Sequence, residues 1–225
     1  MRKALGIAFI ALGCGALAWL FLQPVVSARQ TAQAQERLAT ELPVGPELAG
    51  PAGVPVARST SRGEALTVME IPRFGADWRW VTVEGTELDQ LAEGPGHYVR
   101  TPLPGARGNV AFAGHRAGHG SPFIDFDLLE VGDDVMLEQG DVRWTYRIEK
   151  DPRIVPVDSS WVLRASAQRE LTLTTCWPKY GSSRRMYVRA QLVEVERGDP
   201  GAWTSVWTPS ETASGAASAR AVAQY

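Results

Sequence analysis

Short segments with strong β-strand propensity fill the middle of the sequence. Between residues 65 and 197, runs rich in β-branched and aromatic residues alternate with Gly, Pro and Asp. This punctuation is typical of an antiparallel sheet, sandwich or barrel. The expected strands are 66–71, 79–83, 109–113, 134–138, 142–149, 153–157, 170–175 and 185–195. Eight strands in about 130 residues fit a small closed barrel, because closure removes exposed sheet edges.

Helical character is confined to two short windows of this region. Residues 87–92 form the first window, and Gly94-Pro95-Gly96 ends it. Residues 126–129 form the second, weaker window. The sequence therefore predicts a mainly β fold, a closed eight-stranded barrel with short helices.

The N-terminal segment has the properties of a membrane anchor. Ala4 to Leu22 is an uncharged run of 19 residues, close to the roughly 20 that cross a bilayer as a helix. Arg2 and Lys3 precede it, so the positive-inside rule places the N-terminus in the cytoplasm and the rest of the chain outside. The alternative is a signal peptide cleaved near Ala28, but the run exceeds the roughly 7 to 15 residues of such apolar regions.

Composition divides the chain into four parts. Residues 28–42 favour a short helix continuing from the anchor, whereas Pro and Gly in 43–56 favour an extended, mobile stalk. The C-terminal part is rich in Ser, Thr, Ala and Gly, with Trp203 and Trp207 as groups that can dock on the domain. The predicted parts are a cytoplasmic end with a transmembrane anchor (1–22), an extracytoplasmic stalk (23–64), a globular domain (65–197) and a flexible tail (198–225).

The charge balance of the chain argues against one class of binding partner. The formal net charge is -2 and the isoelectric point is near 6.0, which argues against nucleic-acid binding. Nearly all of the 23 basic residues are arginine. This bias resembles the product of a high-GC bacterial genome.

An exported domain with a free thiol needs an explanation. Cys14 lies in the apolar run, where it is expected to be a small residue buried in the helix, so Cys176 has no disulfide partner. Cys176 follows a predicted strand and precedes Trp177-Pro178, where the backbone must turn. A cysteine at such a strand end is accessible to a substrate, as a nucleophile must be. The alternative is an inert core cysteine.

Histidines offer a possible acid and base for this thiol. His115 follows a predicted strand, and His119 lies four residues later. A zinc pair at this spacing needs a helix, which Gly114, Gly118 and Gly120 oppose. We therefore expect neither a metal nor another cofactor. A loop histidine such as His115 is suited to general acid–base catalysis, and His119 is expected to be a surface residue.

Two arginines open the last predicted strand. If this strand pairs antiparallel with the strand of Cys176, one of Arg184 and Arg185 returns beside the thiol. A guanidinium keeps its charge and can stabilise a developing oxyanion. Successive side chains on a strand point to opposite faces, so only one of the two faces the thiol. The alternative is a pair of solvated arginines at a sheet edge.

Three short motifs carry these residues: AGHR around His115, TLTTC ending at Cys176 and RRMYV opening with Arg184. They resemble the three active-site motifs of bacterial sortases and occur in the same order. Further similarities are Ile71-Pro72, Gly94-Pro95-Gly96-His97-Tyr98, Pro122-Phe123, Leu128-Leu129 and Gly132-Asp133. The resemblance covers about residues 65 to 195. It favours Arg185 over Arg184, because the family's arginine lies three residues before the strand valine, here Val188.

Within sortases the chain is most similar to class E, the actinobacterial housekeeping type. That class often has Pro and Lys shortly after TLTTC, as Pro178 and Lys179 are here. Trp177 is a departure, because many relatives have His or a small polar residue at this position. It adjoins the nucleophile and is placed to alter substrate entry.

The resemblance implies a defined reaction. Cys176 would attack the Thr carbonyl of a C-terminal LPXTG-like signal, often LAXTG in class E, leaving a thioester. His115 would protonate the leaving amine and deprotonate the incoming one, and Arg185 would stabilise the oxyanion. The acceptor would be the amine of the peptidoglycan precursor, lipid II, so surface proteins bearing the signal are the expected substrates. Specific substrate-binding residues remain unassigned.

Three other functions compete with this one. An L,D-transpeptidase also uses a thiol and a histidine, but its cysteine follows a Ser-x-Gly sequence, unlike Thr174-Thr175-Cys176. A class C pilin polymerase carries an Asp-Pro-aromatic lid motif before the barrel, and residues 40–66 contain none. The third is a non-catalytic, membrane-tethered barrel with an inert thiol.

Overall fold

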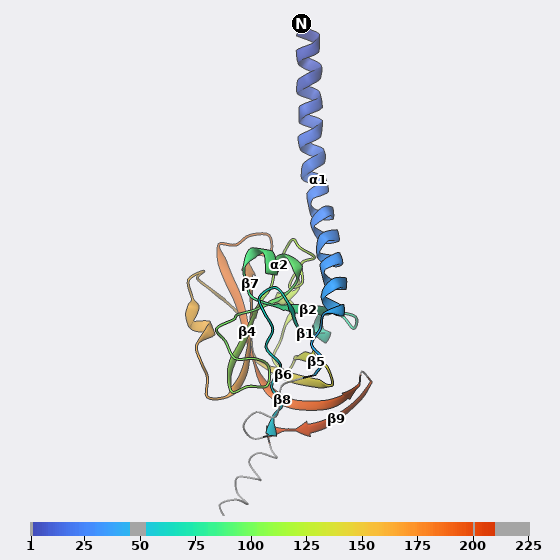
Figure 1. Ribbon diagram of the computed structural model, residues 1–225. Coiled ribbons are helices and arrows are strands. Elements are labelled where there is room, and N and C mark those ends of the chain that lie inside the picture. Colours follow the sequence, from blue (N-terminus) through green and yellow to red (C-terminus); the bar gives the residue numbers. More distant parts are fainter. Residues whose placement is uncertain (1, 46–52, 200, 210–225) are drawn as a thin grey trace, which may run out of the picture.

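A barrel dominates the computed structural model of the chain, which describes residues 2–45, 53–199 and 201–209 (Figure 1). Its strands are β1 (Ala65–Glu70), β2 (Arg79–Glu84), β3 (Gly96–His97), β4 (Gly108–Ala113), β5 (Asp134–Gln139), β6 (Val142–Val155), β7 (Arg169–Trp177) and β8 (Arg184–Asp199). They are ordered β6-β5-β1-β2-β3-β4-β7-β8, and pairing of β6 with β8 closes the sheet. The predicted closed eight-stranded barrel is confirmed.

Individual strands differ from the prediction in two places. The segments 142–149 and 153–157 are one strand, β6, whose register against β8 shifts between Lys150 and Arg153. Pro152 lies within this irregularity and has no N–H to donate, which explains why the sequence pattern breaks there. The two-residue β3 was too short to predict. It pairs parallel with β2, and β4 pairs parallel with β7, so the sheet is mixed.

Every second side chain along the strands points into the barrel, and these apolar side chains fill its interior. On β8, Met186, Val188 and Ala190 are buried in the core, and their partners on β7 include Leu171 and Leu173. Large side chains from the other strands complete the core, among them Phe112, Phe123, Met69, Trp144 and Tyr146. Their burial drives closure of the sheet, because apolar area removed from water contributes about 25 cal/mol per Å².

The two predicted helical windows are short helices in the structure. Helix α2 (Leu88–Glu93) begins at Glu87, whose side chain forms a reciprocal capping box with Gln90. The 3₁₀ helix η3 (Phe126–Leu128) occupies the second window. The sequence did not predict the 3₁₀ helices η2 (Pro72–Phe74) and η4 (Ser160–Leu163).

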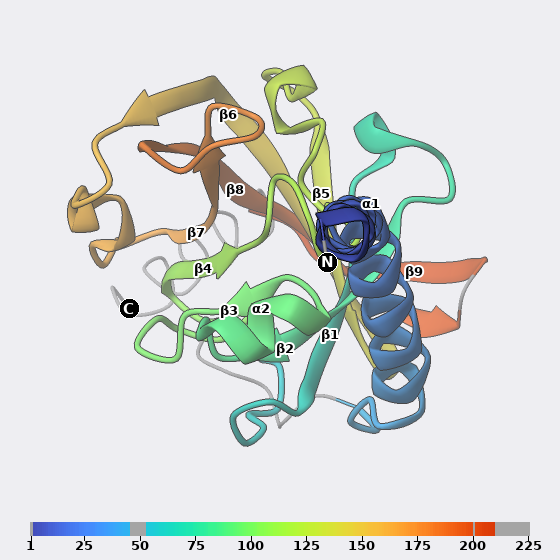
Figure 2. The same cartoon turned by 90° about the horizontal axis from the view of Figure 1, so that it is seen from above.

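The long helix α1 (Arg2–Thr40) projects beyond the barrel, and its C-terminal part lies against the barrel wall (Figures 1 and 2). Leu38 is buried in a cluster with Val68, Val81 and Val83. The Gln35 side-chain amide accepts from Val81 N–H at 2.8 Å and donates to Val81 O at 2.9 Å. Among the described residues, no helix has a stretch that is both long and apolar enough to cross a membrane.

These contacts correct the prediction of a stalk over residues 23–64. The short helix predicted at 28–42 is confirmed as the end of α1, but it packs on the barrel and is not part of a free stalk. The Pro- and Gly-rich part also contributes to the core. Val54 and Ala57 are fully buried, and Trp144 Nε1 donates to Pro55 O at 2.8 Å. Apolar burial outweighs the extended preference of this composition, which a local reading of Pro and Gly does not reveal. Residues 46–52 of the predicted stalk lie outside the described residues.

The predicted tail, residues 198–225, also needs correction in its first part. Strand β8 continues to Asp199, and β9 (Ala202–Trp207) pairs antiparallel with it. The Arg143 guanidinium carbon lies 4.5 Å from the centroid of the Trp203 ring. The Arg169 guanidinium carbon lies 5.9 Å from the centroid of the Trp207 ring. Both indoles dock on the domain, as the sequence allowed, and these contacts help to hold β9 against the barrel. Residues 210–225 lie outside the described residues.

Candidate active site

Strands β7 and β8 place Cys176 opposite Arg185. The antiparallel register pairs these two residues and, next to them, Trp177 with Arg184. Directly opposed residues share a face of the sheet, so Arg185 lies on the face of Cys176 and Arg184 on the other. Cys176 is partly exposed, and the structure leaves it a free thiol, as it does Cys14. The Arg185 Nη1 donates to the carbonyls of Ser182 and Arg184 at 3.1 and 3.2 Å.

Strand β4 brings His115 to the same place. It pairs parallel with β7, with Ala113 beside Thr174. Gly114 N–H donates to Thr174 O at 3.1 Å, and the Thr175 hydroxyl donates to Gly114 O at 2.8 Å. His115 is the next residue of this segment, as Cys176 is the next after Thr175. The barrel therefore gathers the three residues singled out in the sequence at one end of β4, β7 and β8.

The loop after His115 holds the second histidine against the first. The two imidazoles stack with centroids 4.8 Å apart and planes 26° apart. His119 adopts a positive φ of 48°, which is strained for a residue with a side chain. From α1, the Ser27 hydroxyl accepts the His119 backbone N–H at 3.2 Å and lies 3.3 Å from its Nδ1. His119 is thus partly buried beneath α1 and is not the surface residue that the sequence predicted.

Burial and this neighbour alter the titration of His115. Burial, and secondarily the positive charge of His119, lower the His115 pKa from its ordinary value. Both causes disfavour the imidazolium, because a buried charge loses hydration and two like charges repel. His115 thus gives up a proton more readily than an exposed histidine.

Arg116 is a residue near the site to which sequence reasoning gave no role. Its side chain is 1% exposed, and its Nη2 donates to Asp127. The Nη1 lies 3.7 Å from Met186 Sδ, and the guanidinium carbon lies 4.9 Å from the Trp177 ring centroid. Arg116 therefore ties the histidine loop to the residue after Cys176. Its place in the AGHR motif was the available signal.

A pocket of about 300 Å³ lies on the outer face of β7 and β8. Tyr98, Thr174, Arg185 and Tyr187 line one side of it, and residues 155–160 with Val162 and Leu163 line the other. The Tyr98 and Thr174 hydroxyls share a hydrogen bond of 3.0 Å. These are substrate-binding candidates that the sequence did not identify, because the loop at 155–163 meets the strands only in the folded chain.

A buried amide holds that loop in place. Asn109 Nδ2 donates to Val162 O at 3.0 Å and to Arg164 O at 3.2 Å, while its Oδ1 accepts from Thr172. Asn109 is completely buried. A buried polar side chain with all these partners fixes the loop conformation, since leaving any of them unpaired costs about 1 to 3 kcal/mol.

Known proteins with this arrangement share sequence with the chain. A curated sortase D of Bacillus subtilis is 33% identical over 128 residues, which cover 56% of this chain and 62% of the relative. Sortase SrtE2 of Streptomyces coelicolor is 32% identical over 133 residues, covering 52% of this chain and 51% of the relative. The chain thus spans about half to three fifths of these relatives.

Solved structures extend the similarity to the fold. Sortase E of Streptomyces avermitilis superposes with a TM-score of 0.60 at 36% identity, covering 64% of this chain and 97% of that one. Sortase E1 of Streptomyces coelicolor, solved with a tripeptide in the active site, gives a TM-score of 0.55 at 28% identity, with the same coverage. Residues 69–193, more than half of the chain, match the Sortase domain. Together with the barrel and the meeting of His115, Cys176 and Arg185, this match shows that the chain belongs to the sortase family.

Proposed function

We propose that this protein is a cysteine transpeptidase that cleaves a C-terminal LPXTG-like or LAXTG-like signal between Thr and Gly. The observation that carries the proposal is the convergence of the thiol, the imidazole and one guanidinium on adjacent strand ends. Cys176 and Arg185 are paired residues of β7 and β8, and β4 delivers His115 beside them. Membership of a family of cysteine transpeptidases supports the same reaction.

The first half of the reaction forms a thioester. His115 takes the proton of the Cys176 thiol, and the sulfur attacks the Thr carbonyl carbon and gives a tetrahedral oxyanion. The Arg185 guanidinium stabilises that oxyanion once it leaves the Ser182 and Arg184 carbonyls. The Thr–Gly bond then breaks, and His115 donates a proton to the Gly amine. The low pKa of His115 favours this transfer.

The second half returns the site to its starting state. An acceptor amine attacks the thioester, His115 takes a proton from it, and the Cys176 sulfur leaves and regains its proton from His115. The new amide bond joins Thr of the substrate to the acceptor. We propose the amine of the peptidoglycan precursor, lipid II, as that acceptor, so that surface proteins become attached to the cell wall.

The pocket beside Arg185 is the proposed binding groove for the signal. It lies on the face shared by Thr174, Cys176 and Arg185, and it is lined by Tyr98, Tyr187 and the loop at 155–163. A tripeptide occupies the active site of the Streptomyces coelicolor sortase E1 structure. By analogy, an extended peptide in this groove would present its Thr carbonyl to Cys176.

The location proposed for the protein follows from its N-terminal segment. The uncharged run from Ala4 to Leu22, preceded by Arg2 and Lys3, is the proposed single-pass anchor, with the N-terminus in the cytoplasm. The barrel would then lie outside the cell near the membrane. Both substrate and precursor would be available there.

Peptide turnover tests this function directly. The full chain in detergent micelles is incubated with quenched fluorescent LPXTG and LAXTG peptides, with and without a glycine-type amine, and products are identified by mass spectrometry. We expect scission between Thr and Gly, an acyl-enzyme on Cys176 and transfer to the amine. Absence of cleavage with all peptides would instead favour a non-catalytic barrel. Preferential transfer to a lysine side-chain amine would favour a pilin polymerase.

A further inference from the structure

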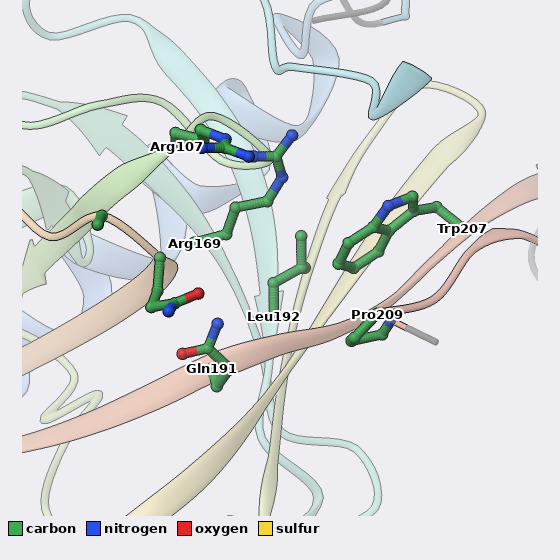
Figure 3. Close-up of a pocket in the computed structure, with 8 residues that line it drawn as sticks. Arg107, Arg169, Gln191, Leu192, Trp207 and Pro209 are labelled. Carbon is green, nitrogen blue, oxygen red and sulfur yellow. The ribbon is translucent and has the colours of Figure 1, made fainter. Parts of the chain in front are cut away.

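A second polar pocket lies at the opposite end of β7 from Cys176. It has a volume of about 180 Å³ and is shown in Figure 3. Its walls come from the turn before β4, the start of β7, the middle of β8 and the end of β9. The residues that the inference uses are Arg107, Gln168, Arg169, Gln191, Trp207 and Pro209. None of them lines the groove beside Arg185.

Backbone pairing brings two arginines together in this pocket. Gly108 N–H donates to Gln168 O at 2.7 Å, and Gly108 is the register partner of Arg169. Arg107 and Arg169 are therefore neighbours across the β4–β7 pair, and Figure 3 shows their side chains next to each other. Arg107 is exposed, whereas Arg169 is 8% exposed.

The close approach of two cations is unfavourable by itself. Burial, and secondarily the positive charge of Arg107, lower the pKa of Arg169. Repulsion between like charges grows as the surroundings become less polar. Two guanidinium groups at one pocket give it a positive potential, which favours an anionic ligand.

The other residues of the pocket restrain the Arg169 guanidinium and add polar and apolar surface. The Arg169 guanidinium carbon lies 5.9 Å from the centroid of the Trp207 ring, a cation–π contact that limits how it can turn. Gln168 and Gln191 place side-chain amides at the pocket, and in Figure 3 the Gln191 amide points into the same space. Pro209 and the Trp207 ring supply apolar surface.

We propose that this pocket binds a carboxylate group attached to a small apolar body. Guanidinium groups match carboxylates in planar, two-point hydrogen bonds. The amides would donate to the remaining oxygen lone pairs, and the Trp207 ring with Pro209 would contact the apolar body. The apolar wall is what favours a carboxylate ligand over inorganic phosphate, which has no apolar part to bury.

Calorimetric titration of the full chain tests the site with two matched probes. N-acetyl-leucine carries the carboxylate, and N-acetyl-leucinamide has the same body without the charge. We expect the acid to bind at least about tenfold more tightly than the amide, consistent with hydrogen bonds to charged groups. Inorganic phosphate is a third probe, and we expect it to bind more weakly than the acid. Equal affinity for acid and amide overturns the proposal, and tighter phosphate binding overturns the carboxylate assignment.

Two arginine variants separate this pocket from general surface charge. Arg107→Gln is expected to weaken binding of the acid about tenfold, and because Arg107 is exposed the fold should be retained. Arg62→Gln removes another exposed arginine, one that does not line the pocket, and should leave the affinity unchanged. Equal losses in both variants would reduce the effect to net charge and overturn the site. The titration involves no peptide cleavage, so its result is independent of the proposed transpeptidase reaction.

Discussion

The paired strands β7 and β8 carry arginines at both ends of the ribbon, in two different settings. At one end, Arg185 is partly exposed, and its guanidinium donates hydrogen bonds to the Ser182 and Arg184 carbonyls. At the other end, Arg169 is buried beside Trp207 and Arg107. A guanidinium bonded to a loop can reorient toward a transient oxyanion, whereas a buried and stacked one is held in place. The same pair of strands thus carries the proposed reactive site at one end and the proposed carboxylate pocket at the other.

The largest expected effect that distinguishes the two ends comes from the thiol. Cys176→Ala should lower peptide turnover by at least about a thousandfold, because it removes the nucleophile. Carboxylate binding at the Arg169 end should be unchanged. Turnover is measured with the quenched peptides and folding by circular dichroism. Cys14→Ala is the matched control and should behave as wild type. Substantial activity in Cys176→Ala would rule out covalent catalysis at that residue.

The two adjacent arginines give the next largest effect. Arg185→Ala should reduce turnover on the order of a hundredfold, as for the loss of an oxyanion-stabilising group. Arg185→Lys should remain strongly impaired, since it keeps the charge but loses the planar fork. Arg184→Ala should change turnover little, because its partner across the ribbon is Trp177. If Arg184→Ala were the crippled variant, the strand face assigned to the site would be wrong.

A smaller effect should appear in the pH profile of turnover. His119→Gln removes the positive charge that helps to lower the His115 pKa, so that pKa should rise while burial keeps it below its ordinary value. The limb of the profile that reports His115 should move to higher pH. Ser27→Ala loses the contact with α1 but keeps both imidazoles, so it serves as the control and should leave the limb in place. An unchanged limb in His119→Gln would contradict electrostatic coupling between the histidines.

The smallest expected effect tests whether the two ends are independent. Arg107→Gln should change peptide turnover by less than about twofold, because distant sites without shared partners act additively. Steady-state rates with the quenched peptides measure this. A large loss of turnover would show that the pocket at Arg169 influences the reaction at Cys176, and the two ends would have to be treated as one coupled unit.

Several features of the fold were predictable because they are local. The apolar and β-branched residues at 171–175 are typical of a strand, and the structure has them as part of β7 with all five buried. The helix predicted at 87–92 is also local, because the Glu87–Gln90 capping box that begins it lies within four residues. Strand β9 was missed because the segment 198–225 around it is rich in Ser, Thr, Ala and Gly, a composition typical of a loose tail. Within that segment Trp203, Val206 and Trp207 favour a strand, and pairing with β8 forms it.

The sequence by itself determined the chemistry available to this protein: a free thiol at a strand end, a histidine after another strand and paired arginines opening a third. These are encoded within short segments, where residue type and strand periodicity suffice. Only the tertiary structure decided which groups meet. The β4–β7 pairing joins His115 to the Cys176 strand, packing of α1 brings Ser27 to His119, and the β4–β7 and β8–β9 pairings assemble the pocket of Arg107, Arg169 and Trp207. Such meetings depend on closure of the barrel, which is a balance of contacts between distant segments and leaves no periodic signal in any one of them.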